Sequence, residues 1–152
     1  MAAIKMKTTV KYRLAANCPS HSRADIGVRD LNFSIDEPIE RGGTNFGPAP
    51  TEAALASLVG CLNVIGHKCA EKLGADIGEL TIDLVGDFDR RGAILAEEIE
   101  LPFPAISATV RSTGDADQET LDRVGAEVEK YCPLSKLFVN AGTKLDVKWL
   151  KG

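Results

Sequence analysis

The sequence has no surplus of basic residues, since 18 lysines and arginines stand against 22 aspartates and glutamates and the formal net charge is −4. A surface without a basic stripe does not attract nucleic acid or anionic lipid, so we expect neither nucleic acid nor a membrane as a partner. The start of the chain also lacks the uninterrupted apolar core of a signal peptide, and no apolar run reaches the length needed to cross a bilayer. We therefore expect a cytoplasmic protein.

Metal-ligand motifs are missing as well. No C-x2-C pair occurs, and the two histidines, His21 and His67, do not fall at the spacings of a zinc site. Cys61, His67 and Cys69 come nearest to a ligand set, and we expect no metal and no bound cofactor. The four cysteines are Cys18, Cys61, Cys69 and Cys132. They are too few for a secreted disulfide scaffold, which leaves catalysis, redox chemistry or plain burial as reasons for them.

A chain of 152 residues is long enough for one domain with a substantial core and too short for two. No repeat, low-complexity tract or linker interrupts it, so we predict a single domain over residues 1–152. Alternation of apolar and polar residues predicts strands, separated by loops rich in Gly, Pro and polar residues. The predicted strands are 7–14, 28–36, 80–89, 106–113 and 144–150, with loops at 15–27 and 90–105.

Capping residues and helical periodicity predict three helices. The first starts near Thr51, a good N-cap, and ends at Gly74. The second lies within 115–131, with Asp115 or Asp117 as its cap. A short third helix begins at Pro133, because proline suits the first helical position.

Strands and helices in this order make an α+β protein. The first helix is unusual because it is apolar nearly all the way round between Ala53 and Leu73. Such a helix must be covered on every side, and a sheet of the same chain covers only one. We therefore expect a homodimer with this helix near its centre.

Two thiols stand out by their positions. Cys61 lies in the middle of the first helix, where no helix end lowers its pKa, and a cysteine there is commonly a small core residue. Cys132 immediately precedes Pro133 and so stands at the start of a helix, where the positive end of the dipole favours a thiolate. Electrostatics alone favour Cys132 as the nucleophile.

The stretch "GPAPTEAALASLVGC" together with "YCPLSK" some seventy residues later (132 − 61 = 71) resembles the OsmC/Ohr family of organic hydroperoxide reductases. In that family a Pro-x-Glu or Pro-Glu opens a long central helix, the first cysteine follows the glutamate by nine residues, and the second precedes a proline in a C-P-x-S turn. Here Glu52 and Cys61 have that spacing (61 − 52 = 9), and "CPLS" is intact. The resemblance implies antiparallel sheets packed around long central helices in an intertwined homodimer.

The resemblance also implies a mechanism. Cys61 attacks an organic hydroperoxide as a thiolate and becomes a sulfenic acid, with which Cys132 condenses to form a disulfide. Arg23, in the loop after the first predicted strand, matches the family's catalytic arginine and supplies the positive charge that Cys61 needs. Glu52 holds that arginine by a bidentate pair. A dithiol such as dihydrolipoamide, free or on a lipoylated protein, then reduces the disulfide.

Apolar side chains one turn from each thiol suggest a pocket for alkyl hydroperoxides, although they can equally be core. They are Leu58, Leu62, Leu134 and Phe138. Nine helical positions amount to about 900° and ~13 Å, so Glu52 and Cys61 point to opposite faces of their helix. We therefore expect a composite site, with Cys61 and Cys132 from one chain and Arg23 and Glu52 from its partner. A thiol redox sensor without turnover, a small-molecule-binding module on the same fold, and a structural dimer with buried thiols remain alternatives.

Overall fold

A computed structural model describes residues 6–152. The described chain forms two compact units that divide between Ala53 and Ala54. The division falls in the first turn of the long helix α1, Pro50–Leu73. The ends of α1 agree with the prediction, since Gly74 follows it in the left-handed conformation at φ 68°.

The first unit contains a sheet of three antiparallel strands, β1 Leu14–Asn17, β2 Ala24–Val28 and β3 Leu31–Ile35. The predicted strand at 28–36 contains β3, whereas the predicted strand at 7–14 is wrong and shares only Leu14 with β1. Residues 7–13 alternate in polarity but form no strand, and the segment 28–36 is broken by Arg29, whose φ of 54° closes the turn between β2 and β3. Most of β1 and β2 lies in the stretch 15–27, which its polar residues had marked as a loop.

A loop from Asp36 to Ala49 joins this sheet to α1 and contains a short 3-10 helix, η1 Ile39–Arg41. The buried carboxylate of Asp36 organises the loop by accepting hydrogen bonds from the backbone N–H groups of Glu37, Thr44 and Phe46, at 2.8, 3.0 and 3.1 Å. The Thr44 hydroxyl also donates to it, and this bond is the largest cause of a strongly lowered Asp36 pKa. Gly43 fits here because a Cβ would lie 1.8 Å from the Glu37 carbonyl oxygen.

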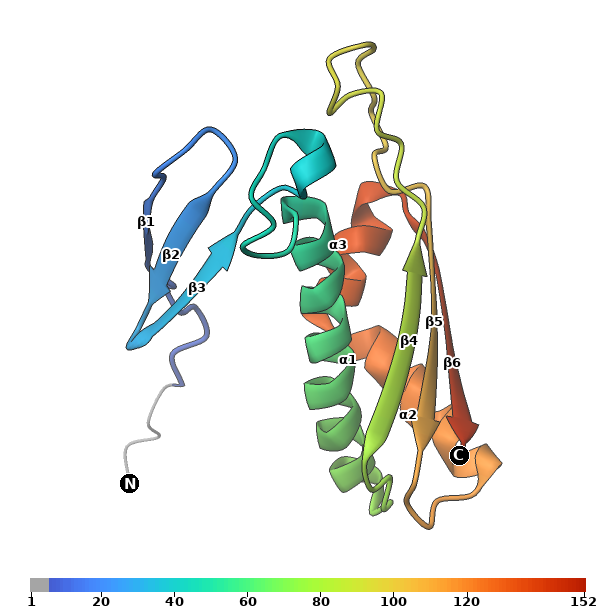
Figure 1. Ribbon diagram of the computed structural model, residues 1–152. Coiled ribbons are helices and arrows are strands. Elements are labelled where there is room, and N and C mark those ends of the chain that lie inside the picture. The colour runs from blue at the N-terminus through green and yellow to red at the C-terminus, as the bar shows by residue number, and fades with distance from the viewer. Residues whose placement is uncertain (1–5) are drawn as a thin grey trace. The chain divides into compact units, whose positions relative to one another are not determined.

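The second unit holds a three-stranded sheet in the order β4-β5-β6 together with most of α1 and two further helices (Figure 1). Its strands are β4 Leu80–Gly86, β5 Ala105–Ser112 and β6 Lys144–Lys151, and its helices are α2 Gln118–Tyr131 and α3 Pro133–Ala141. Asp117, one of the two predicted caps, accepts a hydrogen bond from the backbone N–H of Thr120 and so caps α2. Each element lies where the sequence predicts it.

One pairing departs from the expected antiparallel sheets. β4 and β5 form the predicted antiparallel pair, but β6 runs parallel to β5. The chain leaves β5, passes through α2 and α3, and returns in the same direction, which is the connection that parallel neighbours require. The fold is therefore α+β with one antiparallel and one mixed sheet.

The helices of the second unit pack on one face of this sheet. Alternate residues of β5, from Ile106 to Ser112, are buried, whereas Ser107 and Arg111 between them are exposed. The indole of Trp149 on β6 lies against two glycines: a Cβ at Gly66 of α1 would lie 2.5 Å from the ring, and one at Gly125 of α2 would lie 2.6 Å from it. The two helices can approach the sheet this closely only because both positions are glycine.

Helix α1 buries one side only. Leu58, Leu62, Gly66, Cys69 and Ala70 are buried, whereas residues such as Val64 are exposed. By length and composition α1 is also apolar enough to cross a membrane, contrary to the sequence expectation. Of its most apolar 18-residue stretch, 28% is buried. The core helix of a globular protein passes the same test, so this is weak evidence for a membrane segment.

Candidate thiol site

Cys61 and Cys132 meet in the second unit. The Cys132 thiol donates to the Cys61 sulfur over an Sγ–Sγ distance of 3.2 Å, and both cysteines are unbonded thiols. Cys132 is fully buried and Cys61 is partly exposed. Two thiols in contact, one of them open to the surface, can pass from a dithiol to a disulfide with little movement of the backbone.

Cys132 stands between two helices. Its backbone N–H donates to the Val128 carbonyl at 2.8 Å and so closes α2, while its sulfur accepts from the backbone N–H of Ser135 at 3.4 Å and so caps α3. Pro133 occupies the first position of α3. The prediction that this thiol lies at a helix N-terminus is confirmed.

The surroundings of Cys61 within this unit disfavour its thiolate. Burial is the largest cause of a raised Cys61 pKa, and the hydrogen bond from Cys132 raises it further. The backbone N–H of Leu134 and the charge of Lys68 act in the opposite direction, without reversing the shift. A nucleophilic Cys61 therefore needs an additional positive charge.

Arg23 lies in the first unit, immediately before β2, with its guanidinium held on two sides. Its Nε donates to the Asp25 carboxylate at 2.8 Å, and its Cζ lies 3.6 Å from the centroid of the Phe46 ring. Asp25 also accepts from the Ser34 hydroxyl at 2.6 Å, and the hydrogen bond from Arg23 is the largest cause of its lowered pKa. These contacts hold the guanidinium in one orientation.

The predicted pairing of Glu52 with Arg23 is not found within this unit. The Glu52 carboxylate accepts from the backbone N–H of Ala49 at 2.8 Å, and among residues 6–53 it forms no ion pair. Asp25 takes its place as the partner of Arg23. Asp25 is not among the predicted site residues, although its spacing of two residues from Arg23 on an extended chain puts both side chains on one face.

A model of the OsmC-like protein family matches residues 42–148. This chain belongs to the OsmC-like family. A search of curated proteins gave no match.

Solved structures share the OsmC-like fold at low sequence identity. The OsmC-like protein of Mycoplasma pneumoniae has a TM-score of 0.78 at 16% identity, over 94% of this chain and 99% of that one. An organic hydroperoxide resistance protein OsmC of Legionella pneumophila has a TM-score of 0.68 at 16% identity, over 96% and 99%. OhrB, the organic hydroperoxide resistance protein of Bacillus subtilis, has a TM-score of 0.61 at 19% identity, over 94% and 98%. At these identities the likeness establishes the fold alone.

This OsmC-like chain has two further thiols. Cys69 is buried, and burial is the largest cause of its raised pKa. Cys18 is exposed. The two ring nitrogens of His67 each lie 2.9 Å from a carbonyl oxygen, that of Asn63 and that of Gly78. These contacts fix His67 as a polar residue near the end of α1. Over residues 6–152, no three His, Cys, Asp or Glu side chains cluster closely enough to hold a metal ion.

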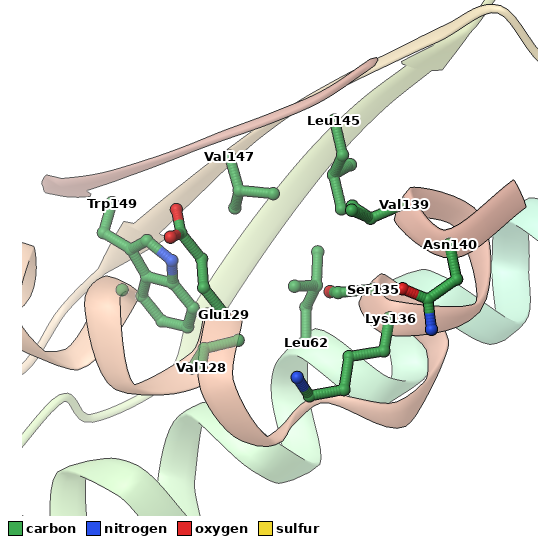
Figure 2. Close-up of a pocket in the computed structure, with 11 residues that line it drawn as sticks. Leu62, Val128, Glu129, Ser135, Lys136, Val139, Asn140, Leu145, Val147 and Trp149 are labelled. Carbon is green, nitrogen blue, oxygen red and sulfur yellow. The ribbon is translucent and has the colours of Figure 1, made fainter. Parts of the chain in front are cut away.

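The four predicted pocket residues belong mainly to the core of the second unit. Leu58 and Leu62 are fully buried, Phe138 packs edge-on against Phe103 with ring centroids 5.7 Å apart, and Leu134 is partly buried. Leu62 also lines a cavity of about 300 Å³, which lies between α2, α3 and β6 (Figure 2). No cysteine lines this cavity.

Proposed function

We propose that this OsmC-like protein is a thiol peroxidase that reduces organic hydroperoxides through Cys61 and Cys132. The observation that carries the proposal is the 3.2 Å contact between the two sulfurs. Membership of the family supports it, as do two structures of the same fold that are named organic hydroperoxide resistance proteins. We also propose that the protein works in the cytoplasm, where dithiol reductants are available.

In the first step the Cys61 thiolate attacks the terminal oxygen of the hydroperoxide. The O–O bond breaks, an S–O bond forms, and the alkoxide takes up a proton and leaves as the alcohol. The sulfur loses two electrons and becomes a sulfenic acid. Cys132 then attacks that sulfur, water leaves, and the Cys61–Cys132 disulfide forms before a second peroxide can oxidise Cys61 further.

An external dithiol completes the cycle. One of its sulfurs attacks the disulfide, the mixed disulfide is resolved by its second sulfur, and both cysteines return to thiols. Cys132 suits the role of first leaving group, since its sulfur accepts a backbone N–H at a helix N-terminus. We expect dihydrolipoamide, free or on a lipoylated protein, to serve as this reductant.

We further propose that a second copy of the chain completes the site. The uncovered side of α1 supports this, because Ala56, Gly60 and Val64 on it are exposed, and small residues there let another helix come close. In such a homodimer the site around each Cys61 contains Arg23 and Glu52 of the other copy. The guanidinium then supplies the positive charge that Cys61 lacks within its own unit.

Peroxide consumption with dihydrolipoamide and cumene hydroperoxide tests the activity. We expect many turnovers per chain, and none for Cys61→Ser. Cys132→Ser should keep the first attack but allow Cys61 to advance to sulfinic acid, detected by mass spectrometry, while Cys69→Ser and Cys18→Ser serve as matched controls. A single stoichiometric reaction would indicate a redox sensor, and no reaction would leave a binding or structural role.

Subunit mixing tests the composite site. When Cys61→Ser chains exchange with Arg23→Ala chains, mixed dimers should regain one good site of two. Activity no higher than the sum of the parents, with exchange verified, would mean that one chain builds each site. Arg29→Ala is the control for Arg23→Ala, and only the latter should raise the pKa measured by alkylation of Cys61.

A further inference from the structure

The cavity between α2, α3 and β6 is a feature that the proposed peroxidase chemistry does not use. Its volume of about 300 Å³ is at the lower end of the range for small-molecule sites. It lies wholly within the second unit, and neither Cys61 nor Cys132 lines it. It is thus a separate space whose occupant can be inferred from its own walls.

Ser135 supplies the most informative group in the cavity. The residue is only 4% exposed, and Figure 2 shows its side chain directed into the hollow beside Leu62. Its backbone N–H is occupied by the sulfur of Cys132, which fixes its position. Among residues 6–152 its hydroxyl forms no hydrogen bond to another residue, and no enclosed side-chain oxygen of these residues lacks a partner, so this hydroxyl is open to the hollow. A hydroxyl that faces a hollow in this way can hydrogen-bond a ligand atom there.

The buried part of the lining is otherwise apolar, while the other polar lining residues, Glu129, Lys136 and Asn140, are all exposed. Leu62, Val128 and Trp149 are buried around the hollow, and Leu145 and Val147 of β6 also line it. These apolar side chains offer no hydrogen bond to the body of a ligand. They accept an aliphatic or aromatic group, whose transfer from water is favourable by about 25 cal/mol per Å² of apolar surface.

The mouth of the cavity carries balanced charge. Glu129 of α2 and Lys136 of α3 both line it, both are exposed, and neither forms an ion pair with another residue of the described chain. A carboxylate ligand would be attracted by Lys136 and repelled by Glu129, and an ammonium ligand would meet the reverse. The net field therefore favours neither sign.

We propose that this cavity binds a small neutral alcohol, with its apolar body among Leu62, Val147 and Trp149 and its oxygen paired with the Ser135 hydroxyl. Because the Ser135 hydroxyl is the one polar group inside the apolar part of the hollow, a ligand with one polar group fits it best. A ligand hydroxyl fits this position because it can both donate and accept a hydrogen bond, as the serine hydroxyl can. The inference stands on the cavity alone and does not depend on the peroxidase proposal.

Trp149 provides the measurement, because it is the single tryptophan of the chain and lines the cavity. Its fluorescence should change saturably when the reduced full-length protein is titrated with cyclohexanol. Methylcyclohexane, which has the same shape without the oxygen, should bind more weakly. Hexanoate and hexylamine should also bind more weakly than hexanol, because the mouth gives neither ion a net attraction that would offset the loss of its hydration.

The variant Ser135→Ala tests whether the cavity is a ligand-binding site or only a void left by imperfect packing. A net hydrogen bond contributes about 0.5–1.5 kcal/mol, so this variant should bind cyclohexanol about 2- to 12-fold more weakly and leave methylcyclohexane binding unchanged. Ser107→Ala, on the exposed face of β5, is the matched control and should change neither. Val147→Phe should fill the hollow and abolish both, with circular dichroism to verify that it folds.

Three results would overturn the proposal. The first is no saturable response to cyclohexanol up to its solubility. The second is equal cyclohexanol affinity in the wild type and Ser135→Ala, which would mean that the hydroxyl takes no part. The third is tighter binding of hexanoate or hexylamine than of hexanol, which would assign the cavity to a charged ligand.

Discussion

Oxidation should make the second unit markedly more resistant to heat. The contact of 3.2 Å between Cys61 and Cys132 predicts that a mild oxidant such as diamide joins these two sulfurs. A disulfide stabilises a fold mainly by restricting the unfolded chain, and the restriction grows with the length of the closed loop. Because the sulfurs already touch in the folded state, little of this gain is lost to strain.

The magnitude follows from the sequence separation of 71 residues. The loop-closure relation gives an entropy loss in the unfolded chain of about 15 cal/mol/K, which corresponds to about 4.4 kcal/mol at 298 K. For a protein of this size, 1 kcal/mol shifts the melting temperature by about 2–4 °C. We therefore expect the oxidised protein to melt roughly 9–18 °C above the reduced one.

The assay is thermal unfolding followed by Trp149 fluorescence, which reports on the unit that contains both cysteines. Reduced and diamide-treated samples are compared at one pH, with peptide mapping to identify the link. Cys61→Ser should melt at one temperature in both conditions, whereas Cys69→Ser should behave as the wild type. A mapped Cys61–Cys132 link with a shift under 2 °C would refute the loop-closure reasoning.

Three further outcomes test the packing. Asp36→Asn should destabilise the protein at neutral pH. Because the pKa of Asp36 is lowered in the folded state, its carboxylate contributes stability that is fully present above the ordinary pKa of 3.8 and is lost as the pH falls below 3.8. The stabilities of wild type and variant, measured as unfolding against pH, should therefore converge in acid. Gly125→Ala places a Cβ 2.6 Å from Trp149 and should cost about 1–3 kcal/mol in urea unfolding, whereas an unchanged midpoint would show that the indole can move aside. Ser112→Ala removes the 2.7 Å bond to the Ile77 carbonyl and should cost about 0.5–1.5 kcal/mol, the net worth of one hydrogen bond, because that oxygen still accepts from the Gly114 backbone N–H at 3.2 Å.

Most of the second unit could be predicted from the sequence because its signals are local. Gly74 and Asp117 mark helix ends by their own backbone and side-chain chemistry, and Pro133 fixes the first turn of α3. The parallel pairing of β6 could not be predicted in this way. Alternation shows which residues of a strand face the core, but the direction of its neighbour depends on the connection between them.

The first unit was harder to predict because its strands are short and polar. Asn17 and Asp25 pair across β1 and β2, although both residues are typical of turns. Arg29 adopts a positive φ that the sequence gives no reason to expect of an arginine. Around the candidate site, the spacing of the motifs pointed to the two thiols that meet. One partner of Arg23, Phe46, could not be predicted in this way, because it lies in a loop that folds back over the guanidinium.

The position of Cys132 between α2 and α3 implies that folding and reactivity favour different residues there. Serine and aspartate are strong N-caps, whereas a thiol is a weak acceptor for the Ser135 N–H. Judged by stability alone, oxygen is the better atom at this junction. A Cys132→Ser chain should therefore fold at least as well as the reduced wild type, and any chemistry it loses can be assigned to the missing sulfur and not to a damaged helix.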